Sequence, residues 1–128
     1  MKNPKKILLP AFCAASLLSL AGCGSGPGKT YVNCTRFFAD GNTEKALTCM
    51  DPSLMQKPGA KEKMSAMISM ASAKVKGEHK GIAKVNLLEE KIDGDMATVK
   101  VHIKYSDGTE QDDSGSLKRI DRKWYLIN

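Results

Sequence analysis

The stretch "ATVKVHIKY", residues 97–105, alternates apolar and polar side chains without a break. Because successive side chains of a strand point to opposite faces, it predicts a β-strand with one buried face. The residues expected on that face are Ala97, Val99, Val101, Ile103 and Tyr105, with Thr98, Lys100, His102 and Lys104 opposite. The Asp-Gly pair at 107–108 then predicts a tight turn into a second, antiparallel strand.

More β-structure is expected on both sides of this strand. Residues 82–92 have mixed apolar content and are separated from it by a turn at 93–95. Residues 109–120 return as a more polar strand, in which Gly115 suggests a bulge. Residues 123–127 complete the sheet as an edge or closing strand. The C-terminal half therefore predicts an antiparallel meander of about four strands.

The N-terminal half has helical spacing. Tyr31, Cys34 and Phe38 recur three and four residues apart, and the pattern from residue 30 ends at Gly41. A short helix is expected from Asn42 or Thr43 up to 51–52. The segment after Pro58-Gly59, "AKEKMSAMISMASAKVKG", predicts a third helix that ends near Gly77. Helices followed by an antiparallel sheet define an α+β fold.

Residues 1–22 have the composition of a signal peptide. Three lysines near the start precede an apolar stretch, residues 7–20, and the segment contains no acid. At about fourteen residues, this stretch is shorter than the roughly 20 residues that a membrane-spanning helix needs. The sequence therefore predicts a leader that is cleaved rather than a permanent transmembrane anchor.

The leader ends in Leu20-Ala21-Gly22-Cys23, which resembles the lipobox of bacterial lipoproteins. The resemblance implies cleavage before Cys23, lipidation of its thiol and acylation of the new amine, palmitate being one such acyl group. Since glycine and not aspartate follows Cys23, the resemblance also implies that the protein is anchored at the periplasmic face of an outer membrane. Several acyl chains would make membrane residence effectively permanent. The alternative is an ordinary secretory leader that leaves Cys23 as a thiol or a disulfide partner.

The sequence after the leader predicts a short tether and one domain. Residues 23–29 are expected to be the lipidated cysteine and a flexible Gly-, Ser- and Pro-containing linker, and residues 30–128 the domain. Without residues 1–22 the chain has 17 Lys+Arg against 14 Asp+Glu, a net charge of +3. This mild charge, the predicted export and the lack of a basic patch interleaved with aromatic residues argue against nucleic acid as a partner.

Cys34 and Cys49 are predicted to form a disulfide. Cys13 leaves with the leader and Cys23 is modified, so these are the two cysteines that remain to pair. They lie seven residues before Gly41 and seven after Asn42, so antiparallel helices joined at that turn would bring them level. An oxidising compartment would then close the bond. The alternative is two small buried apolar side chains.

Three longer segments carry a family resemblance. "FFADGNTEKALTCM" (37–50), "GDMATVKVHIKYSDGTEQDD" (94–113) and "LKRIDRKWYLI" (117–127) look like small bacterial lipoproteins of unknown function with a nuclear-transport-factor-2-like, cystatin-related cone fold. The resemblance covers about residues 30–127, and its motifs mark no active site. It implies N-terminal helices packed on a strongly curved antiparallel sheet, often with a pocket between them.

Methionine and histidine offer the candidate metal ligands. Met64, Met67 and Met70 would place three thioethers along one side of a helix, which suits Cu(I). The simpler interpretation, which we favour, is that these flexible side chains pack against the curved sheet. His79 and His102 are far apart in the sequence and are expected to be solvated, so no zinc site is predicted.

The acidic and basic clusters also have structural interpretations. The acids at 93–95 and 112–113 lack the alternating ligands and distal glutamate of a calcium-binding loop. "SGS" at 114–116 lacks the flanking glycines of a nucleophile elbow. The lysines at 74, 76, 80 and 84 suit anionic lipid headgroups or, more simply, a solvated face.

Three classes of function compete: a non-catalytic binding or scaffolding lipoprotein, an enzyme that acts on a small molecule in a cone pocket, and a copper-handling protein. An enzyme needs a base, a nucleophile or a metal in a sheltered site, whereas the predicted inward strand face offers only Tyr105 as a polar group. We therefore expect a binding domain without catalytic residues, cofactor or metal. Its expected partners, besides the membrane, are an apolar small ligand or an envelope protein.

Overall fold

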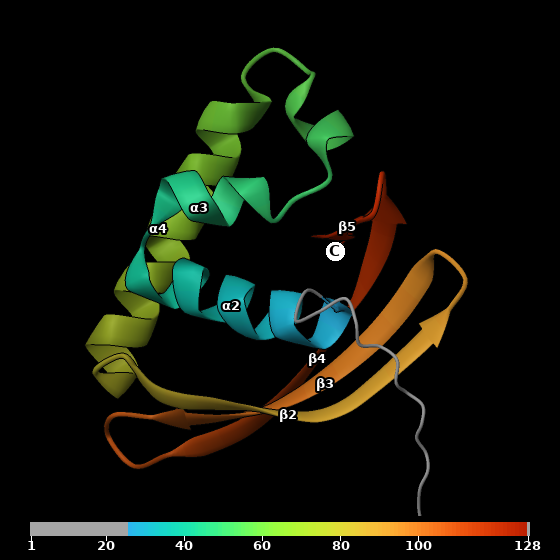
Figure 1. Ribbon diagram of the computed structural model, residues 1–128. Helices are drawn as coiled ribbons and strands as arrows, with labels where there is room; N and C mark the ends of the chain where they lie inside the picture. The colour runs from blue at the N-terminus through green and yellow to red at the C-terminus, as the bar shows by residue number, and fades with distance from the viewer. Residues whose placement is uncertain (1–25, 128) are drawn as a thin grey trace, which may run out of the picture.

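The computed structural model of the chain describes residues 26–127, in which helices come first and strands follow (Figure 1). The helical elements are α2 (Pro27–Asp40), α3 (Thr43–Thr48), the 3-10 helix η2 (Pro52–Met55) and α4 (Ala60–His79). The strands are β2 (Ile82–Asp93), β3 (Met96–Tyr105), β4 (Glu110–Ile120) and β5 (Lys123–Leu126). They pair in that order as one antiparallel sheet, which is curved. The predicted α+β cone is confirmed, while the leader and Cys23 lie outside the described residues.

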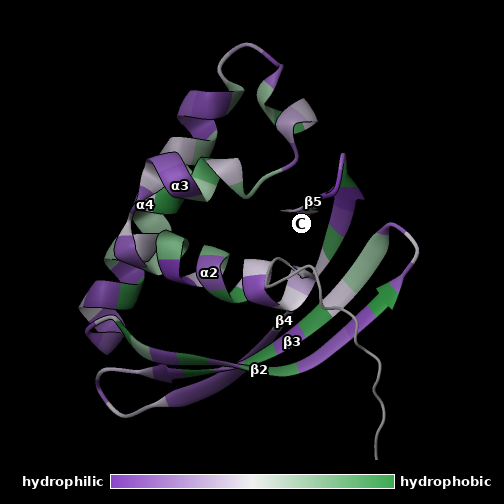
Figure 2. Cartoon of the chain, in the orientation of Figure 1, coloured by the Kyte–Doolittle hydropathy of each residue, from purple (hydrophilic) through white to green (hydrophobic). Residues whose placement is uncertain are grey.

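The inner face of β3 forms the centre of the core. All five side chains predicted to point inward are buried, from Ala97 to Tyr105. Figure 2 shows hydrophobic and hydrophilic bands that alternate along the strands. Leu117, Trp124 and Leu126 extend this apolar face across β4 and β5. In Figure 1, α2 lies between the sheet and the pair α3 and α4, so the sheet has its helices on one side.

Two irregularities in β2 interrupt its pairing with β3, and Gly115 is not a bulge. The register of β2 shifts between Ile82 and Lys84 and again between Leu87 and Glu89. Such bulges bend a strand and increase its twist. Gly115 pairs regularly with Val99. A Cβ atom at position 115 would lie 2.4 Å from Cε2 of Tyr31, so this glycine allows the tyrosine ring to approach the sheet backbone.

The helix boundaries follow local sequence signals, with two differences from prediction. Gly41 has φ 75° and ends α2, and Asn42 caps α3 by accepting a hydrogen bond from the Lys45 N–H, both as expected. However, α2 begins at Pro27, so residues 27–29 of the predicted tether belong to its first turn. The helix α4 runs past Gly77 to His79, because one glycine inside a helix costs only about 1 kcal/mol.

Two long-range hydrogen bonds fix α2 against its neighbours. The backbone N–H of Gly28 donates to Oε2 of Glu90 on β2 at 2.7 Å, which satisfies one of the free donors at the helix N-terminus. At the other end, the buried hydroxyl of Ser72 on α4 donates to the carbonyl oxygen of Ala39 at 2.8 Å. The helix α2 is therefore held to the sheet at its start and to α4 at its end.

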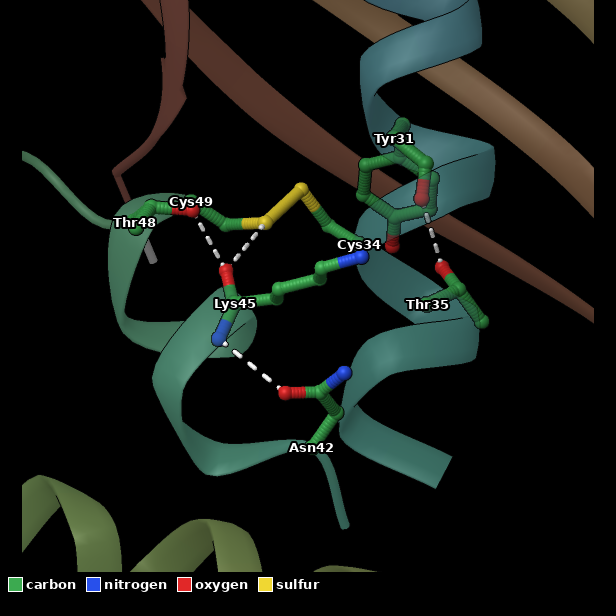
Figure 3. Close-up of a disulfide and its surroundings, with 7 residues drawn as sticks. All are labelled: Tyr31, Cys34, Thr35, Asn42, Lys45, Thr48 and Cys49. Atoms are coloured by element: carbon green, nitrogen blue, oxygen red, sulfur yellow. Dashed lines mark hydrogen bonds between the residues drawn. A yellow bond between two sulfur atoms is a disulfide. The ribbon is translucent and has the colours of Figure 1, made fainter. Parts of the chain in front are cut away.

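A disulfide between Cys34 and Cys49 joins α2 to the end of α3 (Figure 3). The two Cα atoms are 6.1 Å apart, and both side chains are buried. This is the pair that the turn at 41–42 predicts. The backbone N–H of Leu126 donates to the carbonyl oxygen of Cys49 at 2.7 Å, so the end of α3 is also hydrogen-bonded to the last strand, β5.

Removal of the disulfide is predicted to destabilise the domain without changing its fold. The double substitution Cys34→Ala, Cys49→Ala should lower the free energy of unfolding by about 3 kcal/mol, the chain-entropy value for a separation of 15 residues. Urea unfolding followed by circular dichroism measures the change. Wild-type protein kept in reductant is the control and should lose a similar amount. Equal stability of oxidised and reduced wild type would contradict the prediction.

Candidate ligand-binding pocket

A pocket of about 280 Å³ opens between the helices and the inner face of the sheet. Its apolar lining comes from α2, α4 and three strands: Phe38, Ala39, Ala71, Val75, Ile82, Ile103 and Leu126. The remaining lining residues are polar: Tyr31, Thr35, Tyr105, Gln111 and Asp113. The volume corresponds to about nine water molecules at the density of the liquid. The pocket is therefore suited to a small ligand with about ten non-hydrogen atoms.

The polar groups of the pocket form two hydrogen-bonded pairs. The hydroxyl of Tyr31 donates to Oδ2 of Asp113 at 3.1 Å. The hydroxyl of Tyr105 donates to Oε1 of Gln111 at 3.4 Å. Burial, strengthened by the negative charge of Asp113, raises the pKa of Tyr31 well above its ordinary value, and it also raises the pKa of Tyr105. Both phenols therefore stay protonated and serve as hydrogen-bond donors.

The pairing of β3 with β4 places the acid and the amide in this pocket. Asp113 lies opposite Val101 and Gln111 opposite Ile103, so both share the inner face with the buried residues of β3. The expectation that Tyr105 alone is polar on the inward face was wrong, because it considered β3 and not the polar strand beside it. The alternation of β4 counted from Leu117 would have placed Gly115 and Asp113 on the same face.

A second hollow of about 450 Å³ lies elsewhere on the domain. It is bounded by α3, η2, the start of α4 and β5, and its lining includes Met50, Met55, Lys61 and Tyr125. Although this hollow is larger, the inner face of β3 does not contribute to it, and η2 buries none of its residues. We take the pocket beside Asp113 as the candidate site because hydrogen-bonded polar groups converge on its apolar walls.

Of the three methionines of α4, Met64 is half-buried, but Met67 and Met70 do not pack as predicted. Met67 and Met70 are 59% and 72% exposed, and Ile68 and Ser72 are the buried residues of this helix. The reason is the spacing: three residues fall about 60° short of a full turn, so Met70 points about 120° away from Met64. Such a spread also argues against a shared copper site. Met64 and Met67 border a small apolar hollow with Phe38 and Met50.

The two histidines have acidic partners instead of being simply solvated. The ring of His79 stacks on Tyr105 with centroids 4.1 Å apart, and its Nδ1 lies 3.2 Å from Oδ2 of Asp107. His102, on the outer face of β3, lies between Asp112 and Glu110, with Nδ1 2.6 Å and Nε2 2.5 Å from their oxygens. Neither histidine lines the pocket. Hydrogen bonds that His102 donates to Asp112 and, with a smaller effect, to Glu110 raise its pKa above the ordinary value of 6.5.

Other charged residues have structural partners or lie in solvent. Arg119 forms an ion pair with Asp95 at 3.0 Å and lies over the ring of Trp124. The four lysines of the basic run are exposed, and Lys76 donates to the carbonyl oxygen of Asp40 at 3.0 Å. Within residues 26–127, no group of three or more His, Cys, Asp and Glu side chains is arranged to hold a metal ion.

Comparison with solved structures identifies the fold. A Campylobacter jejuni protein with the provisional name NTF2-like transpeptidase has a crystal structure similar to this chain, with a TM-score of 0.71 and 22% sequence identity. The match covers 81% of this chain and 99% of that protein. A SEC-C motif containing protein from Rhodopseudomonas palustris is less similar, with a TM-score of 0.55, 14% identity and coverage of 82% and 77%. The chain therefore has a nuclear-transport-factor-2-like fold.

The sequence also assigns the chain to a family. Residues 21–127 match the domain of unknown function DUF4878, and the chain belongs to this family. No curated protein matches the sequence. Among the helices of residues 26–127, none combines the length and the apolar character that crossing a bilayer requires.

The pairing of His102 with two acids predicts a pH dependence of stability. Folding raises the pKa of His102, so protonated His102 stabilises the folded state. This stabilisation is complete below about pH 6.5 and is lost as the pH rises through the folded-state pKa of His102. His102→Gln should therefore destabilise the protein more at about pH 5.5 than at about pH 9. Urea unfolding at both pH values measures the difference. NMR titration should show that Asp112→Asn lowers the pKa of His102, and an unchanged pKa would contradict the assignment.

Proposed function

We propose that this protein is a lipid-anchored binding domain of the bacterial cell envelope, whose pocket takes a small ligand with an apolar body. The observation that carries this proposal is the pocket of about 280 Å³ under α2, with apolar walls and a few converging polar groups. Small-molecule sites commonly have this composition. The envelope location rests on the leader and the lipobox-like ending at Cys23.

The chemistry of the pocket favours binding over catalysis. Its two phenols have raised pKa values, which is the wrong direction for a phenolate nucleophile. Cys34 and Cys49 are joined to each other, so neither offers a thiolate. The provisional name of the Campylobacter jejuni protein refers to transpeptidase activity. At 22% sequence identity, however, the structural similarity supports a shared fold and not a shared activity. We therefore assign no transferase role to the Asp113 pocket.

The position of Cys23 would hold the pocket close to the membrane. Since α2 begins at Pro27, the four Cα steps from Cys23 to the helix span at most about 14 Å. Residue 31, at the second turn of the same helix, already lines the pocket. A ligand taken from the bilayer surface, or passed to it, would thus travel a short distance.

The surface next to the start of α2 suits contact with lipid. Leu87 lies close enough to Gly28 that a Cβ atom there would be 2.7 Å from its Cδ2 atom. Further along the same β2–β3 hairpin, Leu88 and Ile92 are 51% and 55% exposed. The free energy falls when large apolar side chains leave water, so their exposure favours contact with an apolar surface. We propose that this hairpin rests on the membrane that holds the anchor.

The anchor is tested by metabolic labelling with a palmitate analogue in a Gram-negative host. Wild-type protein should take up the label and fractionate with membranes, whereas Cys23→Ala should lose the label because the thiol that begins lipidation is absent. Cys13→Ala is the matched control, since Cys13 lies within the predicted leader, and it should label normally. Equal labelling of Cys23→Ala and wild type would refute the proposed anchor.

The pocket is tested by photolabelling of the full-length protein in maltoside micelles with a short-chain alcohol that bears a diazirine. Labelled peptides should include the ranges 31–38 and 103–113, each of which contains residues that line the pocket. Ala71→Trp should reduce this labelling several-fold by filling the pocket. Ala73→Trp, on the same helix but outside the lining, is the control and should leave it unchanged. If both variants label like wild type, the pocket is not the binding site.

A further inference from the structure

Among the residues that the structure describes, the lining of the pocket contains one negatively charged side chain and no basic side chain. Of its twelve lining residues, Asp113 is the one with an ionisable carboxyl group, and the set contains no lysine, arginine or histidine. Within residues 26–127, Asp113 also has no ion pair with a basic side chain. Its hydrogen-bond partner there is the neutral hydroxyl of Tyr31. Among residues 26–127, therefore, no basic side chain lines the pocket or pairs with its one carboxylate.

The geometry of the carboxylate leaves room for a ligand. Tyr31 donates to Oδ2, and a carboxylate has about four acceptor positions on its two oxygens. Asp113 is exposed at the pocket, so a ligand can reach it without breaking the bond to Tyr31. The second oxygen is thus a ready acceptor for a charged or polar hydrogen on a bound molecule.

Aromatic rings supply the other half of a cation site. Tyr31, Phe38 and Tyr105 all line the pocket. His79 covers one face of the Tyr105 ring and the Tyr31 ring packs against Gly115, so a cation would meet the uncovered ring faces, which carry partial negative charge. Recognition of substituted ammonium groups by proteins commonly uses such rings. The apolar residues from α4 and β3 would contact the uncharged part of the same ligand.

We propose that the pocket selects small molecules that carry a positively charged nitrogen on an apolar body, with Asp113 as the counter-charge. This inference rests on the proposed function, because it names the ligand class of the same pocket. Amines and quaternary ammonium compounds of about ten non-hydrogen atoms fit its volume. Anions of the same shape are disfavoured, because their charge would face the carboxylate of Asp113.

The test compares three ligands of similar shape that differ in charge: benzyltrimethylammonium, benzyl alcohol and benzoate. Binding to the full-length protein in uncharged maltoside micelles is measured by saturation-transfer NMR, with empty micelles as the blank. Wild type should bind the cation about three- to tenfold more tightly than the alcohol, the range expected for one exposed charge with aromatic neighbours, and benzoate most weakly.

Two variants test how much of the selectivity comes from Asp113. Asp113→Asn keeps an acceptor for Tyr31 but removes the charge, so it should lower the preference for the cation over the alcohol to the part that the aromatic rings supply. Asp93→Asn makes the same change of net charge at the exposed end of β2, outside the pocket lining, and should keep the preference.

The outcomes separate this inference from the proposed function. If the alcohol binds but wild type shows no preference for the cation, the charge selectivity is refuted and the apolar pocket stands. Selectivity that is undiminished in Asp113→Asn, or that disappears in Asp93→Asn, refutes the role of Asp113. If none of the three ligands binds, both the inference and the assignment of the pocket as a binding site fail.

Discussion

The contact between Tyr31 and Gly115 sets the distance between α2 and the sheet. Any larger side chain at position 115 would collide with the tyrosine ring, since even a Cβ atom would lie 2.4 Å from it. With glycine there, the ring rests on the backbone of β4 and its hydroxyl reaches Asp113, two residues away on the same face. The pocket lies immediately beside this contact. One small residue in a strand thus allows both the packing of the main helix and the polar end of the candidate site.

Most of the fold could be predicted because its signals are local. The alternation of residues 97–105, the glycine at 41 and the capping Asn42 each act within a few residues, and each has its expected role in the structure. The pairing of Cys34 with Cys49 follows from the same turn. The helix α4 shows the limit of this approach, because its Ala- and Met-rich composition predicts a helix but not which side of it is buried.

The candidate site was harder to predict because it depends on contacts between distant segments. Tyr31 and Asp113 are 82 residues apart, and neither belongs to a recognisable motif. Two signals were available. A glycine inside a strand indicates either a bulge or a close approach of another group, and Gly115 is the second case. The face of β4 also follows from its apolar residue Leu117, but the acids at 112 and 113 were considered only as calcium ligands.

The residues that stabilise α2 are also the residues that shape the pocket, and this has a consequence for ligand binding. Tyr31 is held by its hydrogen bond to Asp113 and by the ring contact with the sheet, while the disulfide one turn later fixes the same helix. Side chains that are already ordered lose little conformational entropy when a ligand arrives. Asp113 keeps its bond to Tyr31 and offers its other oxygen, so binding need not compete with folding. A pocket held in this way can recognise a small ligand with few contacts, because the protein is ordered before the ligand binds.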